Sequence, residues 1–208
     1  MNVDAARAEV MALMQALEEE PHHVQQVSRL AGQLFDALED LHGLGDHDRL
    51  ILESAGLLHD IGWSTKRDGK GHHRESARLI REHSWTVFNA ESVTILAQVA
   101  RYHRKSMPTL EHEEFAALSP AERVRVQQLA ALLRIADGLD RGHQQLVQEL
   151  AVDLQPGRIL VRLVTRREAT RELAAAERKA DLARCVFHGA VEFTQAPFPA
   201  EAKDGSTT

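Results

Sequence analysis

Apolar residues recur at the three- and four-residue spacing of amphipathic helices over the first two thirds of the chain. This spacing predicts helices over residues 2–18, 21–41, 48–59, 72–83, 89–102 and 119–140. Ser119, Pro120 and Glu122 give the clearest start signal, because serine caps a first turn, proline can open it and glutamate bonds back to the cap. Residues 61–71 are rich in glycine and cations and predict a loop. We therefore expect an all-helical domain over residues 1–147.

After about residue 148 the pattern changes to a period of two, which is typical of half-buried strands. Residues 150–154 and 158–164 alternate apolar and polar side chains, and a Gln-Pro-Gly turn between them predicts a hairpin. Residues 168–182 predict a helix, whereas residues 185–193 predict a last strand that Cys185 opens as a small buried hydrophobe. The fold class expected is mainly α, with a small α+β domain over residues 148–197 and a disordered tail over 198–208.

The composition is that of an ordinary globular protein. Hydrophobic residues make up 43% and charged residues 27%, which excludes a disordered, collagen-like or coiled-coil chain. The net charge of −6 disfavours nucleic-acid binding, which depends on clustered lysine and arginine. No apolar run approaches the roughly 20 residues of a membrane helix, and the acidic N-terminal segment does not resemble a signal peptide. A single cysteine excludes a disulfide framework, so we expect a cytoplasmic protein. Because no membrane helix is predicted, we also expect no membrane contact.

Histidine is the unusual residue, with twelve copies. His59 and Asp60 are adjacent at the end of an apolar helix, where the backbone can turn both side chains toward one point. His23 lies on the first turns of the 21–41 helix, and Asp137 lies among apolar residues of the 119–140 helix, where a carboxylate needs a cation. Nitrogen and oxygen ligands on three helices suit divalent ions such as Mn²⁺, Fe²⁺ or Mg²⁺. An isolated His-Asp pair is weak evidence by itself, because a capping aspartate beside an unremarkable histidine is the commoner case.

The order His, His-Asp, Asp is the one that defines the HD superfamily of metal-dependent phosphohydrolases. The chain resembles the C-terminal half of the exopolyphosphatase and guanosine-pentaphosphate phosphohydrolase family (Ppx/GppA) over residues 20–195. The stretches that carry the resemblance include AGLLHDIGW, ARYHRKSMP and LLRIADGLDRGH, together with residues 23–38 and 71–80. The resemblance implies a helical HD domain that binds one or two divalent ions of the Mn, Fe, Mg, Co or Ni class. It also implies hydrolysis of a phosphomonoester or phosphodiester, with a nucleotide as the favoured substrate.

One departure from the family changes this expectation. The family's exopolyphosphatase site lies in an actin-like domain that precedes the HD region, whereas only about twenty residues precede that region here. We therefore do not expect exopolyphosphatase activity, and the HD site would have to perform any chemistry. The alternative is a non-catalytic regulatory module that binds a nucleotide or polyphosphate. Glu75 stands where the family usually has a further histidine, so no role is assigned to that position. A homodimer is left open.

The resemblance assigns candidate roles to particular residues. His59 and Asp60 are the catalytic candidates, and His23 is preferred to His22 as a ligand because it matches the frame of the family helix. HD proteins with two ions add histidines in the region that follows, so the predicted metal ligands are His23, His59, Asp60, one of His72 and His73, His103 and Asp137. With a single ion, the additional histidines would instead contact phosphate or line the pocket.

Cations near these ligands predict a phosphate-bearing substrate. The candidates for substrate binding are Lys66, Arg104, Lys105, Arg134 and Arg141, although each taken singly could belong to a solvated face. Trp63 is interpreted as core rather than as a stacking surface. The remaining histidines lack a partner pattern and are interpreted as surface or structural residues: His42, His47, His83, His112, His143 and His188.

Overall fold

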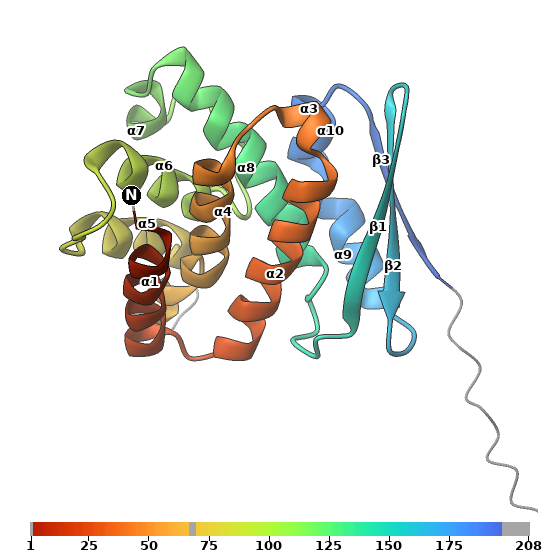
Figure 1. Ribbon diagram of the computed structural model, residues 1–208, viewed down its shortest axis with the longest axis horizontal. Helices are drawn as coiled ribbons and strands as arrows, with labels where there is room; N and C mark the ends of the chain where they lie inside the picture. Colours follow the sequence, from red (N-terminus) through yellow and green to blue (C-terminus); the bar gives the residue numbers. More distant parts are fainter. Residues whose placement is uncertain (1, 67–69, 197–208) are drawn as a thin grey trace, which may run out of the picture.

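The first two thirds of the chain fold into helices that follow the predicted segments, except that the helix predicted over 21–41 is divided at Leu38 and a short helix over 113–116 was not predicted (Figure 1). The computed structural model describes residues 2–66 and 70–196. Along the helical part the elements are α1 (Val3–Leu17), α2 (Pro21–Ala37), α3 (Glu39–His42), α4 (Asp46–Leu58), the 3₁₀ helix η1 (Ile61–Ser64), α5 (His72–Glu82), α6 (Ala90–Arg101), α7 (Glu113–Ala116) and α8 (Pro120–Gly138).

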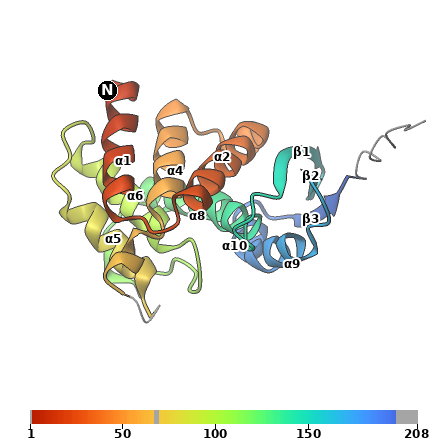
Figure 2. The same cartoon turned by 90° about the horizontal axis from the view of Figure 1, so that it is seen from below.

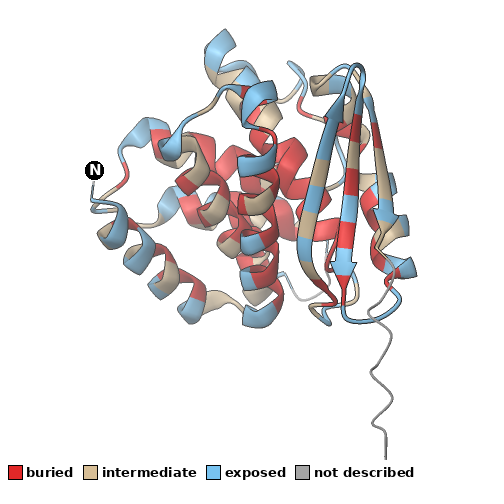
Figure 3. Ribbon diagram, turned by 45° about the vertical axis from the view of Figure 1, so that its right-hand side comes forward, coloured by how far each residue is buried: buried red, intermediate tan, exposed pale blue. Residues whose placement is uncertain are grey.

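Helix α8 is the centre of the packing. It contacts α2, α4 and α6 on one side and α9 (Thr170–Lys179) and α10 (Asp181–Val186) on the other (Figures 1 and 2). Its start has the predicted capping box, in which the Ser119 side chain accepts from the Glu122 backbone and the Glu122 side chain accepts from the Ser119 backbone. Every residue from Leu129 to Gly138 is buried, so the second half of this helix lies inside the protein (Figure 3).

Two glycines bring the elements around the end of α4 close together. A Cβ atom on Gly56 would lie 2.6 Å from the Cα of Ser28, so the crossing of α4 with α2 requires a residue without a side chain. A Cβ atom on Gly62 would lie 2.2 Å from the carbonyl oxygen of His72, so η1 packs directly against the start of α5. The segment that contains His59 and Asp60 is therefore held between α2 and α5.

The C-terminal part is a three-stranded sheet with two helices on one side. Strands β1 (Val147–Gln155) and β2 (Arg158–Thr165) form the predicted antiparallel hairpin, and β3 (Ala190–Gln195) lies parallel to β2. The parallel pairing needs a crossover, which α9 and α10 supply. Alternate residues of β2 are buried, as the period of two predicts (Figure 3). The mainly α fold class with a small α+β part is thereby confirmed.

Some boundaries differ from the predictions. Cys185 lies in α10 and is exposed, because Leu182 and Ala183 bury the other side of this short helix; the last strand begins only at Ala190. The predicted helix over 168–182 is interrupted at Ala180, between α9 and α10. Residues 61–64, predicted as loop, form η1.

The predicted tail over residues 198–208 lies outside the described residues. The division into two domains at residue 147 stays a prediction. One hydrophobic cluster contains buried residues from both sides of that boundary, from Ala6 to Val191.

Candidate metal centre

A pocket of about 490 Å³ opens beside the end of α8. Its walls come from the connection between α1 and α2, the segments that follow α4 and α6, the loop after α8, and helix α9. Histidine and aspartate side chains form its floor, and arginine and lysine side chains lie around them. The pocket therefore combines candidate metal ligands with candidate phosphate-binding cations.

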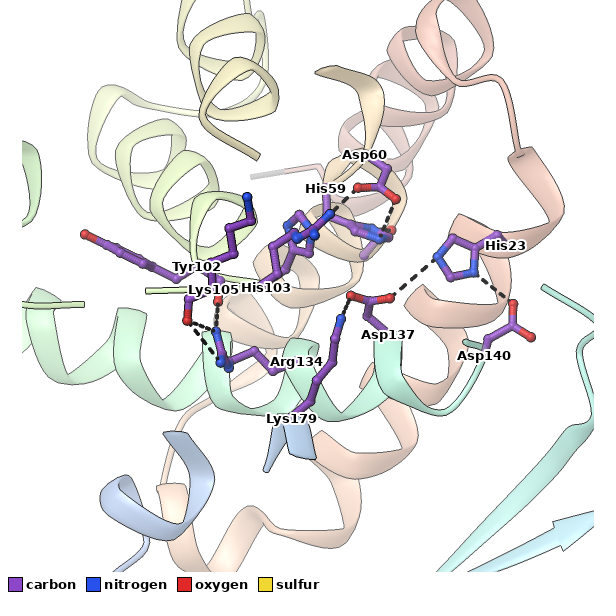
Figure 4. A network of polar contacts seen from close by, with 12 residues as sticks. His23, His59, Asp60, Tyr102, His103, Lys105, Arg134, Asp137, Asp140 and Lys179 are labelled. Atoms are coloured by element: carbon purple, nitrogen blue, oxygen red, sulfur yellow. Dashed lines mark hydrogen bonds and ion pairs between the residues drawn. The ribbon is translucent and has the colours of Figure 1, made fainter. Parts of the chain in front are cut away.

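Six of the predicted ligands lie close together beside this pocket, and Figure 4 labels all of them except His72. Each of three overlapping groups offers ligand atoms that all lie within 4.8 Å of one another. The groups are His23 with His59 and Asp60, His59 with His103 and Asp137, and Asp60 with His72 and His103. The members come from α2, the end of α4, the start of α5, the end of α6, and α8. Helices far apart in the sequence thus deliver nitrogen and oxygen atoms to one point.

The end of helix α4 explains how two adjacent residues share one site. The helix ends at Leu58, and Asp60 has φ −110° and ψ 1°, which takes the chain out of the helix and into η1. Consecutive residues of a continuous helix would point about 100° apart. The turn instead brings Nε2 of His59 to 3.5 Å from Oδ2 of Asp60.

Three of the histidines are held by their other ring nitrogen. The Nδ1 atom of His59 donates to the carbonyl oxygen of Gly56 at 2.8 Å, and that of His103 donates to the carbonyl oxygen of Ala100 at 2.7 Å. His23 uses Nδ1 to bond the buried carboxylate of Asp140 at 2.9 Å. In a neutral ring these bonds leave the lone pair on Nε2, which faces the centre. This is the arrangement that orients histidine ligands in metal sites.

Two buried atoms at the centre lack a hydrogen-bond partner among the described residues: Nε2 of His59 and Oδ1 of Asp60. The nearest groups to Oδ1 are Nε2 of His72 at 3.3 Å and Nε2 of His103 at 3.5 Å, which are ion-pair distances. A buried polar atom without a partner is costly. A divalent ion would satisfy both atoms at once, so the residues present fit a metal.

The charge states also suit metal binding. Burial raises the pKa of Asp60. The neighbouring imidazoles of His59, His72 and His103 lower it by more than burial raises it, so the pKa lies well below its usual value. Burial likewise raises the pKa of Asp137, and the charges of Lys179, His59 and His103 outweigh that effect. Burial, followed by the charge of His59, lowers the pKa of His103 well below its usual value. Ionised carboxylates and neutral imidazole are the forms that bind metals.

The structure distinguishes between the two histidines that begin α5. His72 lies in a ligand group and its ring stacks on Trp63 with centroids 4.3 Å apart. His73 belongs to none of the three groups and lines a separate small pocket beside Tyr102 and His112. The geometry therefore favours His72. Trp63, interpreted above as core, is half-buried and lines the main pocket.

The predicted phosphate-binding cations divide into two sets. Arg104, Lys105 and Arg141 line the pocket. Lys66 is exposed and does not line it. Arg134 is buried and does not line it either: its guanidinium donates to both carboxylate oxygens of Asp181, at 3.0 and 2.8 Å, and to backbone carbonyl oxygens at the end of α6.

The place of Arg134 indicates a positioning role. One of its carbonyl partners belongs to Lys105, whose φ of +58° lies in the left-handed region that few residues other than glycine adopt. Arg134 thereby stabilises the strained turn that presents Lys105 to the pocket.

Sequence reasoning missed several residues of the pocket. His143, interpreted as a surface or structural residue, stacks on His23 with ring centroids 3.9 Å apart and pairs with Glu20 at 2.7 Å. Asp140 holds His23, and only its spacing of three residues from Asp137 hinted at this. Arg178 and Lys179 reach the pocket from α9, and no local pattern links that helix to His59 and Asp60.

Comparison with protein families gives a match over most of the chain. A family model described as Ppx/GppA phosphatase, domain III, matches residues 7–179. The search of curated proteins found no match. Over residues 2–66 and 70–196, no helix is long and apolar enough to cross a membrane.

Proposed function

The chain belongs to the Ppx/GppA phosphatase family through domain III, and on that premise we propose that it is a metal-dependent phosphohydrolase of the HD superfamily. The observation that carries this proposal is a pair of buried atoms, Nε2 of His59 and Oδ1 of Asp60, that have no hydrogen-bond partner within residues 2–66 and 70–196 and lie where six ligand residues converge. The ligands proposed are His23, His59, Asp60, His72, His103 and Asp137.

The number of ligands supports two ions rather than one. A catalytic ion needs open positions for water and substrate, so six protein ligands exceed what one ion can use. His59, Asp60 and His103 each belong to two of the three groups, which is consistent with neighbouring ions that share a centre. When bound by these residues, a divalent ion would supply Lewis acidity toward a phosphoryl oxygen and a nucleophile at neutral pH.

The protein's own groups hold the substrate and the centre in place. The low pKa of Asp60 makes it a better ligand and hydrogen-bond acceptor than a general base, because a base is most effective with a pKa near the working pH. Arg104, Lys105 and Arg141 bind non-reacting phosphate oxygens, and their charges stabilise the negative charge on the phosphoryl oxygens in the transition state. The Nδ1 bonds of His23, His59 and His103 keep the three rings fixed during turnover.

The pocket also has room for more than a phosphate group. Its volume of about 490 Å³ falls within the range of small-molecule sites. Trp63 and His143 place aromatic surface in its wall. These features support a nucleotide as the substrate, hydrolysed as a phosphomonoester or phosphodiester.

The test is a panel of phosphomonoesters and phosphodiesters, nucleotides included, assayed with Mn²⁺, Mg²⁺, Co²⁺ and Ni²⁺. We expect metal-dependent hydrolysis by the wild-type chain and its loss in Asp60→Asn. Asp153→Asn serves as the matched control, because Asp153 is exposed on β1. A chain that binds metal and nucleotide but turns over no member of the panel would instead be the non-catalytic regulatory module.

A further inference from the structure

The side chain of Lys179, at the end of α9, reaches the candidate metal centre. The Nζ atom of Lys179 forms an ion pair with Oδ2 of Asp137, from a different part of the chain (Figure 4). Asp137 belongs to the ligand group that also contains His59 and His103. The ammonium group therefore binds an oxygen of a carboxylate that would also bind a metal ion.

This contact separates Lys179 from the other cations of the pocket. Within residues 2–66 and 70–196, no other lysine or arginine forms an ion pair with Asp60 or Asp137. The neighbouring Arg178 lines the same pocket, and no ion pair is seen for it in the described part of the chain. A direct ion pair with a candidate ligand is thus the property of one particular side chain.

The burial of Asp137 explains why such a partner is needed. The Asp137 residue is 7% exposed, and Oδ2 of its carboxylate forms the ion pair with Lys179. A buried carboxylate without a counter-charge is strongly unfavourable. Lys179 supplies one positive charge to this carboxylate in the absence of a metal, and a divalent ion would supply two.

We propose that Lys179 is a built-in competitor for the divalent ion, which neutralises Asp137 in the metal-free protein and is displaced from it when the ion binds. This inference rests on the proposed metal centre. The competition lowers the metal affinity below the value that the six ligands alone would give. It also keeps the metal-free pocket folded, because Asp137 has a partner in both states.

A second consequence concerns phosphate. The displaced ammonium group stays beside the pocket, because Lys179 is the last residue of α9 and already lines the pocket wall. A bound phosphate would give it a new counter-charge. Metal and phosphate should therefore bind cooperatively, with each raising the affinity of the other by the same factor.

The experiment is a titration of the full chain, stripped by chelator, with Co²⁺ alone. Binding is followed by the visible absorption of the ion and by calorimetry, and no turnover is measured. We expect Lys179→Met to bind Co²⁺ about tenfold more tightly than wild type, because a unit charge a few ångströms from the ion is removed in a partly solvated site. Lys179→Arg keeps the charge and should stay near wild type.

Arg178→Met is the matched control, since it removes a cation from the next position without breaking an ion pair to a ligand. We expect it to change Co²⁺ affinity much less than Lys179→Met. In a second series, inorganic phosphate should raise the Co²⁺ affinity of wild type, and this increase should shrink in Lys179→Met. Lys179→Gln repeats both series, and circular dichroism confirms that each variant is folded; the side chain is 21% exposed and lies outside the hydrophobic core.

Two results would overturn the inference, and they differ in what else they affect. If wild type binds Co²⁺ and folded Lys179→Met and Lys179→Gln bind it no more tightly, Lys179 is not a competitor, while the metal centre stands. If neither wild type nor any variant binds Co²⁺, the assignment of the metal centre is wrong, and the role proposed for Lys179 is wrong with it.

Discussion

Asp140 is not a proposed ligand, but it bonds the ligand His23. Changing Asp140 therefore tests how residues behind the ligands orient them. The residue is 1% exposed, and both of its carboxylate oxygens accept hydrogen bonds. Oδ2 accepts from Nδ1 of His23 at 2.9 Å, and Oδ1 accepts from the backbone nitrogen of Gln145 at 2.8 Å. In Asp140→Asn one acceptor becomes an amide NH₂. This group either opposes the N–H of Gln145 or faces Nδ1 of His23, where it places the ring proton on Nε2, the atom proposed to bind the metal.

The size of the effect follows from these two bonds. Loss of a hydrogen bond to a buried charged group costs about 1.5–3 kcal/mol of unfolding free energy. Loss of a partner that orients a histidine ligand lowers metal affinity by about 10- to 100-fold. We therefore expect Asp140→Asn to bind Co²⁺ at least about tenfold more weakly, and to unfold at a lower urea concentration.

The assay pairs a Co²⁺ titration with urea unfolding of the metal-free protein. Asp153→Asn is again the control, because its carboxylate is exposed and bonds only the nearby Gln155 among the described residues. A folded Asp140→Asn that binds Co²⁺ as tightly as wild type would show that Asp140 does not orient His23. The role of His23 as a ligand would then need separate evidence.

Four further predictions follow from other contacts. His103→Ala should lower the metal content from about two ions per chain to about one, measured by elemental analysis, and should reduce kcat far more than it raises KM; unchanged metal content with only a raised KM would favour a single ion. Arg134→Met should lower the unfolding free energy by on the order of 2 kcal/mol in urea and raise KM, because the turn at Lys105 loses its support; an unchanged KM would contradict the positioning role. Ser119→Ala should cost about 1 kcal/mol by loss of the helix cap, measured in urea. Bonds from Ser119 lower the pKa of Glu122, so this carboxylate contributes stability above its unfolded pKa and loses it as the pH falls through its lower folded pKa; an equal effect of Glu122→Gln at pH 7 and pH 2 would contradict this.

Local signals were sufficient to predict most of the helices and much of the candidate ligand set. Apolar spacing located the segments that become α2, α4, α6 and α8, because each buries a stripe of its surface. The convergence of His23, His59, Asp60 and Asp137 was foreseeable because each lies on or at the end of an apolar, buried helix. Which of His72 and His73 belongs to the ligand set was not foreseeable, because the two residues are adjacent in the sequence. The contact of α5 with η1, which Gly62 permits, is tertiary and decides which of them faces the centre.

Long-range contacts account for the remaining differences. Lys179 lies 42 positions from Asp137 in the sequence, and only the packing of α9 on α8 brings them together. Arg134 has helical spacing relative to Asp137, which suggested a shared site, but its guanidinium lies one turn earlier on α8 and pairs with Asp181 of the C-terminal part. Cys185 is followed by residues with strand propensity, and the burial of Leu182 and Ala183 against the core overrides that preference.

The proposed metal centre is tested most directly by the metal content of one pair of variants. His59 belongs to two of the three ligand groups and is fully buried, whereas His22 is exposed on the first turn of α2 beside a proposed ligand. Both variants, His59→Ala and His22→Ala, are purified alongside wild type, loaded with Mn²⁺ or Co²⁺, desalted and measured by elemental analysis, with circular dichroism as the check on folding. We predict that wild type and His22→Ala retain the same metal-to-protein ratio and that folded His59→Ala loses most of it. Equal metal content in all three proteins would contradict the assignment of the centre.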